Sequence, residues 1–464
     1  MRISRLPYSI GGLVKIRQLD LSECKEIEEL PDSIGELQSL VELDLSSTSI
    51  DHLPDSIGKL KQLKVLRMSN IRGITKLPSA IGLVEKLEEL DVRGCCNLTG
   101  EIPKEIGGLS CLKILNLSDT RICILPTMVS HLSTIQTLEL EKYSELEQLP
   151  ELPQSLTCLT WSCKKYWGSS KETHYWHVEE YWQEQNRAHE EHEPEEYWHV
   201  APKACLGIDI PLPTRIGAPS QQETLVMTLP TSISSLSQLK TLKLCCHNVQ
   251  FLPQLPSSLR ELQLRHLATT RSPDFSYLKD LSILTFFECS LEFSRIFDAE
   301  SEELHIELCE FREVDAPLQL EMKRLRSLEM ANCKFLPEVL DLSCMKNLEK
   351  VDLGYCLSLV EIRGLEELGS LCSLTVFECP SLERMSDLSK LKKLPKLRVH
   401  YCGKLNKEEI YWNYWNGEFG GDICNVGGFD LSSVLDESKI DAFFGRLSPT
   451  IGASNATSTS AVVS

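Results

Sequence analysis

The side chains in this sequence that are best suited to metal chemistry are histidines and cysteines, the usual ligands of zinc. Histidines gather within residues 164–227, where His189 and His192 stand three residues apart and His174, His177 and His199 lie nearby. Imidazoles at that spacing share one face of a helix. The segment lacks the HExxH pattern of zinc proteases, however, and it is rich in Glu, Trp and Tyr. We therefore favour a solvated or partner-contacting segment over a metal site.

Cysteines are the second candidate, and eight of the nineteen recur at one phase of a sequence repeat. They are Cys24, Cys95, Cys289, Cys309, Cys333, Cys356, Cys379 and Cys402. No CxxC pair occurs, so the spacing is unlike that of a zinc site. We predict a buried column of thiols at the corner where each strand turns away. Neighbours one strand apart would be close enough for disulfides, although a chain without a secretory signal favours thiols.

The sequence contains no GxSxG nucleophile elbow, no kinase HRD or DFG phrase, no EF-hand loop and neither of the glycine-rich phosphate loops. These observations predict a protein that is not an enzyme and that binds no cofactor.

A repeated sequence phrase predicts the strands and turns that would position any site. The phrase LxxLxLxx, often followed by Cys, Asn or Thr, opens seven units at Ile16, Leu40, Leu63, Leu87, Leu112, Ile135 and Leu156. A second series has strand centres at Leu242, Leu262, Leu284, Leu304, Leu328, Val351, Leu374 and Leu397. Spacings of roughly 20 to 29 residues are those of leucine-rich repeats. The sequence therefore predicts about fifteen repeats.

Each unit has two halves. The first, as in Leu40–Leu45, alternates apolar and polar residues like a short strand, while the second, as in Leu53–Leu60, spaces apolar residues by three after a proline. Gly35 and Gly82 mark a turn that needs unusual dihedrals or close backbone approach. We predict an α/β leucine-rich-repeat solenoid, or horseshoe, with a concave parallel β-sheet, short helical or 3₁₀ turns on the convex side and one insertion.

Four segments are predicted along the chain. Residues 1–163 form a first block of about seven repeats that starts midway through a repeat without a capping sequence, and residues 164–227 form a Trp-, Tyr-, His- and Glu-rich insertion. Residues 228–408 form a second block of about eight repeats, and residues 409–464 form a C-terminal cap and a disordered tail. Because solenoids need polar caps, we expect either that an upstream domain is missing from this sequence or that the product is truncated.

Outward positions of the concave strands supply the candidate binding residues. These are Asp20, Glu42, Asp44, Arg67, Glu89, Asp91, Glu139, Glu141, Lys243, Phe287, His305, Phe377 and Arg398. The N-terminal part is acidic and suits a basic partner surface, whereas the later part is mixed and more aromatic. An alternative of equal weight is that Asp in Leu-Asp-Leu is ordinary repeat vocabulary, since outward positions must be polar.

Charge and hydropathy limit the partners. Asp and Glu outnumber Lys and Arg by 67 to 48, giving a net charge of −19 that repels nucleic acid. No apolar run approaches the roughly 18 to 20 residues that span a bilayer, and no secretory signal opens the chain. We therefore expect a cytoplasmic protein with protein partners, without nucleic acid or membrane.

Three phrases carry a family resemblance: Leu30–Leu37 (LPDSIGEL), Leu43–Ser46 (LDLS) and Val351–Leu359 (VDLGYCLSL). They resemble the repeat region of plant nucleotide-binding leucine-rich-repeat disease resistance proteins, best in the Toll/interleukin-1-receptor (TIR) subclass. The resemblance covers roughly residues 1–163 and 228–408. It implies plant innate immunity, with repeats that sense a pathogen effector, directly or through a guarded host protein, and that restrain a nucleotide-binding domain. The chain lacks the family's phosphate-binding loop and signalling domain, so those activities do not carry over to it.

Two other functions stay open. Leu98–Pro103 (LTGEIP) matches the vocabulary of leucine-rich-repeat receptor ectodomains, and Asn97 and Asn116 begin glycosylation sequons. A stand-alone intracellular repeat scaffold is the third alternative.

Overall fold

The computed structural model describes residues 5–143, 146, 148–163, 229–245, 249, 252–267, 273–292, 300–312, 322–386, 388, 391, 394 and 396–405. These form two compact units, Met1–Glu313 (unit 1) and Val314–Ser464 (unit 2). The predicted insertion at 164–227, with its histidines, and the predicted segment at 409–464 lie outside the described residues. The four-segment division therefore stays a prediction.

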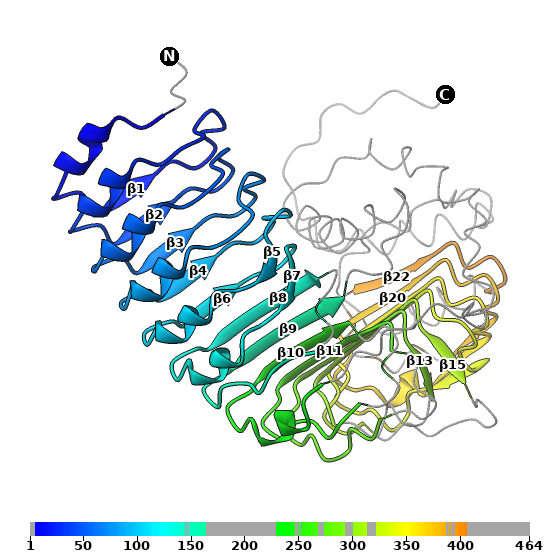
Figure 1. Ribbon diagram of the computed structural model, residues 1–464. Helices are drawn as coiled ribbons and strands as arrows, with labels where there is room; N and C mark the ends of the chain where they lie inside the picture. The colour runs from blue at the N-terminus through cyan, green and yellow to red at the C-terminus, as the bar shows by residue number, and fades with distance from the viewer. Residues whose placement is uncertain are drawn as a thin grey trace, which may run out of the picture. The chain divides into compact units, whose positions relative to one another are not determined.

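Unit 1 is built on one parallel sheet whose strands follow one another in chain order (Figure 1). Its strands are β1 (Gln18–Asp20), β2 (Glu42–Asp44), β3 (Val65–Arg67), β4 (Glu89–Asp91), β6 (Ile114–Asn116), β8 (Thr137–Tyr143), β9 (Cys158–Cys163), β10 (Thr241–Cys245), β11 (Glu261–Arg265), β12 (Ile283–Phe287) and β14 (Glu303–Glu307). Each of these strands lies at a position that the repeat phrase predicted, so the predicted strand register is confirmed.

Unit 2 continues the same pattern by itself. Its sheet contains β16 (Ser327–Ala331), β18 (Lys350–Gly354), β20 (Ser373–Phe377) and β22 (Lys396–His400). Among the described residues, the main-sheet strands number eleven in unit 1 and four in unit 2.

Short 3₁₀ helices return the chain to the next strand. They are η1 (Tyr8–Gly12), η2 (Asp32–Glu36), η3 (Asp55–Lys59), η4 (Ser79–Leu83), η5 (Lys104–Gly108), η6 (Thr127–His131) and η9 (Thr231–Ser235) in unit 1, and η10 (Leu365–Glu367) in unit 2. All but η10 begin directly after a proline, whose fixed φ and missing N–H suit the start of a turn. The 3₁₀ form of the predicted turns is confirmed.

A second, shorter set of parallel strands follows the corner of some repeats. In unit 1 these are β5 (Thr99–Glu101) with β7 (Arg121–Ile124) and β13 (Ser290–Glu292) with β15 (Glu310–Arg312); in unit 2 they are β17 (Val339–Asp341), β19 (Glu361–Arg363) and β21 (Arg384–Met385). The sequence did not predict them. Between the two sets of strands the backbone takes a positive φ, as at Asn70, Leu308 and Tyr355.

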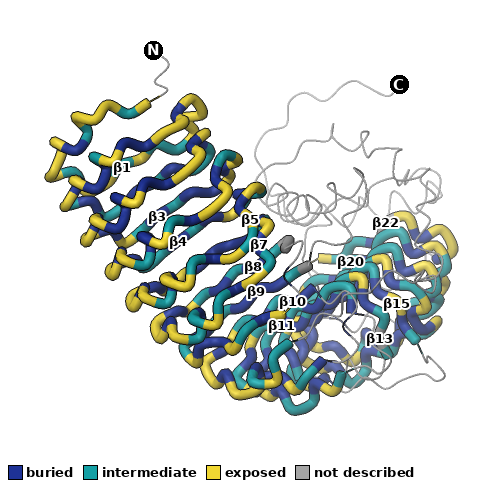
Figure 2. The backbone as a smooth tube through the Cα atoms, viewed as in Figure 1, coloured by how far each residue is buried: buried dark blue, intermediate teal, exposed yellow. Residues whose placement is uncertain are grey.

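The core lies between the main sheet and the turns. The central leucines Leu43, Leu66 and Leu90 occupy one register position and are fully buried. Figure 2 shows the resulting alternation of buried and exposed positions along each repeat. Burying each such side chain contributes roughly 1.5–3 kcal/mol.

The cysteine column is buried in seven of its eight positions, and every described cysteine is a free thiol. The prediction is wrong for Cys24, which is exposed. The physical reason is local: Cys24 belongs to the repeat of β1, and no described strand packs on the outer side of β1. Leu13 and Val14 in that repeat are likewise about half exposed, at 52% and 49%.

The described residues hold no group of three or more His, Cys, Asp or Glu side chains that could bind a metal ion. None of their helices is long and apolar enough to cross a membrane.

Candidate recognition surface

The main sheet of unit 1 carries a continuous row of outward side chains, one from each strand. In register order this middle column is Asp20, Asp44, Arg67, Asp91, Asn116, Glu139, Thr160, Lys243, Gln263, Thr285 and His305. Glu42 and Glu89 stand two residues before the column on their strands, and Glu141 stands two residues after it. All eleven predicted residues of unit 1 therefore lie on the main sheet, and seven of them are in this single column.

The aspartates of the column have a local structural role. The Oδ1 atoms of Asp20, Asp44 and Asp91 each accept a hydrogen bond of 2.9 Å from the backbone N–H two residues further along. This Asx turn stabilises the end of each strand, which supports the interpretation of Asp as repeat vocabulary. It is also compatible with binding, because the hydrogen bonds from Ser22 lower the pKa of Asp20 and keep its carboxylate charged.

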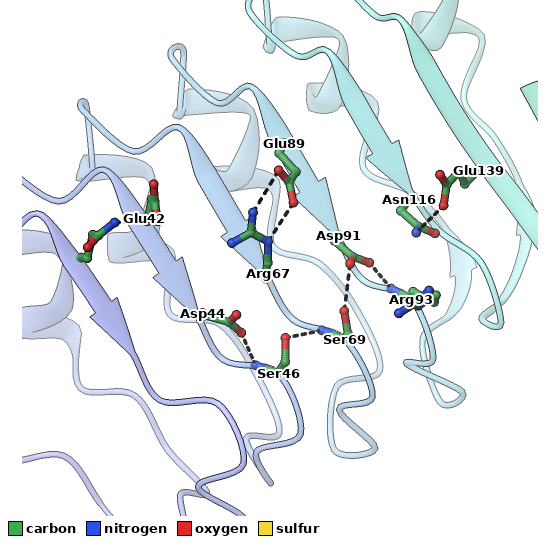
Figure 3. Close-up of polar contacts among 11 residues, drawn as sticks. Glu42, Asp44, Ser46, Arg67, Ser69, Glu89, Asp91, Arg93, Asn116 and Glu139 are labelled. Carbon is green, nitrogen blue, oxygen red and sulfur yellow. Dashed lines mark hydrogen bonds and ion pairs between the residues drawn. The ribbon is translucent and has the colours of Figure 1, made fainter. Parts of the chain in front are cut away.

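Arg67 interrupts the acidic stretch and pairs with Glu89 on the next strand (Figure 3). Its Nε and Nη2 atoms donate to the two carboxylate oxygens at 2.9 and 3.2 Å. The hydrogen bond to Glu89 raises the pKa of Arg67. The paired Glu89 is therefore less available to a partner than the aspartates beside it.

Glu139 is a partly buried carboxylate among the predicted site residues. It accepts a hydrogen bond of 2.6 Å from Nδ2 of Asn116, which is only 7% exposed (Figure 3). Burial, followed by the charges of Glu141 and Asp91, raises the pKa of Glu139. The carboxylates of Glu139 and Glu141 on β8 and of Asp91 on β4 therefore repel one another.

Charge is more mixed from β10 onward. Lys243 lies 2.9 Å from Glu261, and His305 lies 3.5 Å from Glu303. Phe287 is partly exposed, and the guanidinium carbon of Arg265 lies 5.3 Å from its ring centroid. From β10 onward, the outward residues of unit 1 therefore include basic and aromatic side chains beside the carboxylates.

The two predicted residues of unit 2 lie on neighbouring strands. Arg398 belongs to a second column, Glu329, Asp352, Thr375 and Arg398. Phe377 makes edge-to-face contacts with two tyrosines, Tyr355 at 5.3 Å and Tyr401 at 5.6 Å between ring centroids. Sequence reasoning missed both tyrosines, because they occupy the positive-φ corner and not a strand position.

A polar hollow of about 910 Å³ lies beside β19 in unit 2, away from all predicted residues. Its lining includes Glu361, which is held by Arg363 at 2.9 Å. Ser343 and Cys344 also line it, but no histidine does, so the described lining offers no base beside a nucleophile.

Comparison with known proteins places the repeats in a class. Residues 7–99 match the family model described as "Leucine-rich repeat region". A leucine-rich-repeat protein of Leptospira interrogans has a similar structure, with a TM-score of 0.54 and 20% identity, over 90% of this chain and 92% of that one. The fold is therefore a leucine-rich-repeat solenoid, an architecture that uses its extended sheet for binding.

A more particular similarity is found with TMV resistance protein N of Nicotiana glutinosa. The two sequences are 45% identical over 69 residues. That stretch covers 15% of this chain and 6% of the resistance protein.

Proposed function

We propose that this chain is a protein-recognition module of plant innate immunity, the effector-sensing and autoinhibitory repeat region of a disease resistance protein of the TIR type. The similarity to TMV resistance protein N and the repeat phrases of that family support the proposal. Its partner would be a pathogen effector, a guarded host protein or the nucleotide-binding domain of a resistance protein. We place it in the cytoplasm, where a reducing environment preserves the free thiols of its core.

The observation that carries the binding proposal is the row of aspartates at one register position. The side chains of Asp20, Asp44 and Asp91 project from the same face of one sheet. One carboxylate oxygen of each accepts a hydrogen bond from a backbone N–H two residues further along. Preorganised charges of one sign attract a surface of the opposite sign and fix its register. A basic protein surface is therefore the complementary partner, whereas a nucleic acid backbone would be repelled.

The test measures binding of the full chain to the nucleotide-binding domain of a plant TIR-type resistance protein, by biolayer interferometry. Asp20→Lys, Asp44→Lys and Asp91→Lys combined should weaken binding by about tenfold or more, or about 1.4 kcal/mol. The matched control reverses three exposed acids in the 3₁₀ turns, Asp32→Lys, Asp55→Lys and Glu105→Lys, and should bind as the wild type does.

A second variant separates charge from folding. Asp20→Asn, Asp44→Asn and Asp91→Asn keep the oxygen that accepts the backbone N–H and remove only the charge. Weakened binding in this variant, with increased cell death on expression in leaves together with the resistance protein, would support autoinhibition through this face. Equal binding by the wild type and both aspartate variants would refute it.

One of the two glycosylation sequons does not fit the alternative function of a receptor ectodomain. Asn116 is buried, and its side-chain amide donates to Glu139, so a glycan on Asn116 would disrupt the sheet surface. Asn97 is exposed, with its amide bonded to the carbonyl of Arg72 at 2.7 Å.

A further inference from the structure

A line of side chains rich in cations runs along one edge of the main sheet of unit 1, where the chain enters each strand. In the first five repeats the residue directly before the strand is Arg17, Val41, Lys64, Glu88 or Lys113. The backbone N–H of each of these residues donates to the carbonyl of the previous one at 2.7–2.8 Å, so they form one ladder. We call this ladder the basic track. Its cations stand on β1, β3 and β6, the first, third and fifth strands of the sheet.

Glu88 positions two of the three cations of the basic track. The Nζ atoms of Lys64 and Lys113 donate to its two carboxylate oxygens, each at 2.6 Å. These hydrogen bonds, that from Lys113 first, lower the pKa of Glu88 to about 2, so its carboxylate stays ionised. An ammonium group has three N–H donors, so each lysine has two besides the one that bonds Glu88. The lysine side chains are 50% and 49% exposed, and a partner can reach them.

Further exposed lysines widen the basic track on the side of the 3₁₀ turns. They are Lys15, Lys61 and Lys86. Glu85, which lies 3.8 Å from Lys61, and Glu88 are the two acids of the same segments, residues 15–17, 39–41, 61–64, 85–88 and 111–113. Six cations against two carboxylates leave a local charge of +4, although the chain as a whole carries −19.

The spacing of the cations selects the form of an acidic partner. Adjacent strands of a sheet lie about 4.8 Å apart, so cations on alternate strands are separated by about 10 Å. A polyproline II helix has three residues per turn and rises about 3.1 Å per residue, so every third side chain points the same way at intervals of about 9.3 Å. In a β-strand, by contrast, side chains three residues apart point to opposite faces.

The neighbouring acidic side chains favour a single extended chain over a broad anionic surface. Glu42 and Glu89 directly follow the track positions Val41 and Glu88, and Asp20 lies three residues after Arg17. A membrane or a nucleic acid laid over the edge of the sheet would also meet these carboxylates and be repelled. A narrow segment can follow the basic track alone.

We propose that the basic track binds an extended, proline-rich protein segment that carries Asp or Glu at every third residue. The inference goes beyond the proposed function, because it adds a second surface with the opposite charge preference. It does not require the aspartate row to be occupied.

The test uses synthetic peptides as probes and the full chain as the receptor, with fluorescence anisotropy as the measurement. The matching probe is fluorescein-labelled Pro-Pro-Glu repeated three times. The comparison probe has the same composition and charge but places its three glutamates together between two runs of three prolines. The matching probe should bind about threefold or more tightly than the comparison probe, and its affinity should fall as salt is added. A probe with Gln in place of Glu should not bind.

A triple variant removes the cations of the basic track. Arg17→Gln, Lys64→Gln and Lys113→Gln combined should weaken binding of the matching probe by about fivefold or more. The matched control removes three exposed cations from the same repeats, on the other side of the strands, and should bind nearly as the wild type does. Its substitutions are Lys25→Gln, Arg72→Gln and Arg121→Gln.

A single substitution tests the same surface in the opposite direction. Glu88→Gln removes the carboxylate that competes with the probe for Lys64 and Lys113, so binding should become about twofold tighter. A gain in affinity cannot result from misfolding, so this variant keeps the test decisive if the triple variant unfolds.

The proposal would be overturned by equal affinity for the two glutamate probes, by equal losses in the track and control variants, or by weaker binding of Glu88→Gln. Binding to phosphatidylglycerol vesicles without discrimination between the two probes would also overturn it, in favour of a membrane surface. Binding of the matching probe without binding to the nucleotide-binding domain would support the basic track and refute the proposed partner. The reverse result would refute the basic track alone.

Discussion

Glu139 is an acid that the fold holds in an unfavourable environment. Burial and the carboxylates of Glu141 and Asp91 favour its protonated form, and Arg93 and Lys243 oppose them only in part. The folded state therefore binds a proton at Glu139 more tightly than the unfolded chain does. Stability contributed at this position is lost as pH rises from about 4.5, the ordinary pKa of the group, through the raised pKa of the folded state.

Replacing Glu139 with glutamine should stabilise unit 1 at pH 7. The glutamine oxygen can still accept the hydrogen bond from Asn116, while the like-charge repulsion across the strands is removed. We expect a gain of about 0.2–1 kcal/mol in the free energy of unfolding at pH 7, which shrinks towards pH 4. Urea unfolding at several pH values measures it.

The matched control is Glu89→Gln, two residues before the same column on β4. Glu89 is paired with Arg67, so its neutralisation should lower stability at pH 7 or leave it unchanged, opposite in sign to Glu139→Gln. If both variants shift stability in the same direction, the assignment of repulsion to Glu139 is wrong.

For single residues, the sequence predicts the face of the sheet on which a side chain lies better than it predicts the side chain with which it pairs. Strand alternation alone puts Asp44, Asp91 and Glu139 on the outward face, because the side-chain period of a strand is two. Which outward residues pair depends on the register between repeats of unequal length, so Arg67 with Glu89 and Asn116 with Glu139 emerged only from the structure.

Among the elements, the 3₁₀ turns are constrained by their neighbours more than by their own backbone. Gly82 in η4 has no positive φ, but a Cβ added there would lie 2.2 Å from the carbonyl oxygen of Glu105 in η5. Close approach of the backbone, and not unusual dihedrals, therefore requires glycine at this position, because the backbones of adjacent turns stack against each other.

Gly82→Ala should therefore destabilise unit 1 by about 1–3 kcal/mol, the usual cost of overpacking. Gly12→Ala in η1 is the control, since its added Cβ meets nothing within 4 Å. Thermal unfolding of both variants measures the difference. Similar melting temperatures for the two would show that the turns can move apart at little cost.

The strands and turns were predictable because leucine spacing and the Pro-containing half-repeat recur throughout. The second ladders were not. Thr99–Glu101 and Val339–Asp341 are too short to show alternation, and they pair only because the positive-φ corner aligns one repeat with the next. The same corner positions bring Tyr355 and Tyr401 to Phe377, which explains why these ring contacts were not visible in the sequence.

At the scale of the whole molecule, the described thiols of the cysteine column are buried at every position except Cys24. Cys95 in unit 1 and Cys379 in unit 2 are fully buried, whereas Cys24, Cys111 and Cys372 are exposed. Burial raises the pKa of Cys95 to about 12. The neighbouring Cys356 thiol, together with burial, raises the pKa of Cys379 to about 12. Neither thiol can form much of the reactive thiolate near neutral pH.

Alkylation at pH 8 followed by peptide mass spectrometry should therefore modify the three exposed cysteines rapidly and leave Cys95 and Cys379 unmodified in the native protein. The buried pair should react only when their repeats open, so each reports the unfolding of its own unit as urea is added. Because every repeat contacts only its neighbours, the two sites can respond at different urea concentrations. Rapid modification of Cys95 without urea would contradict the stacked arrangement of β3, β4 and β6 that positions the acidic face.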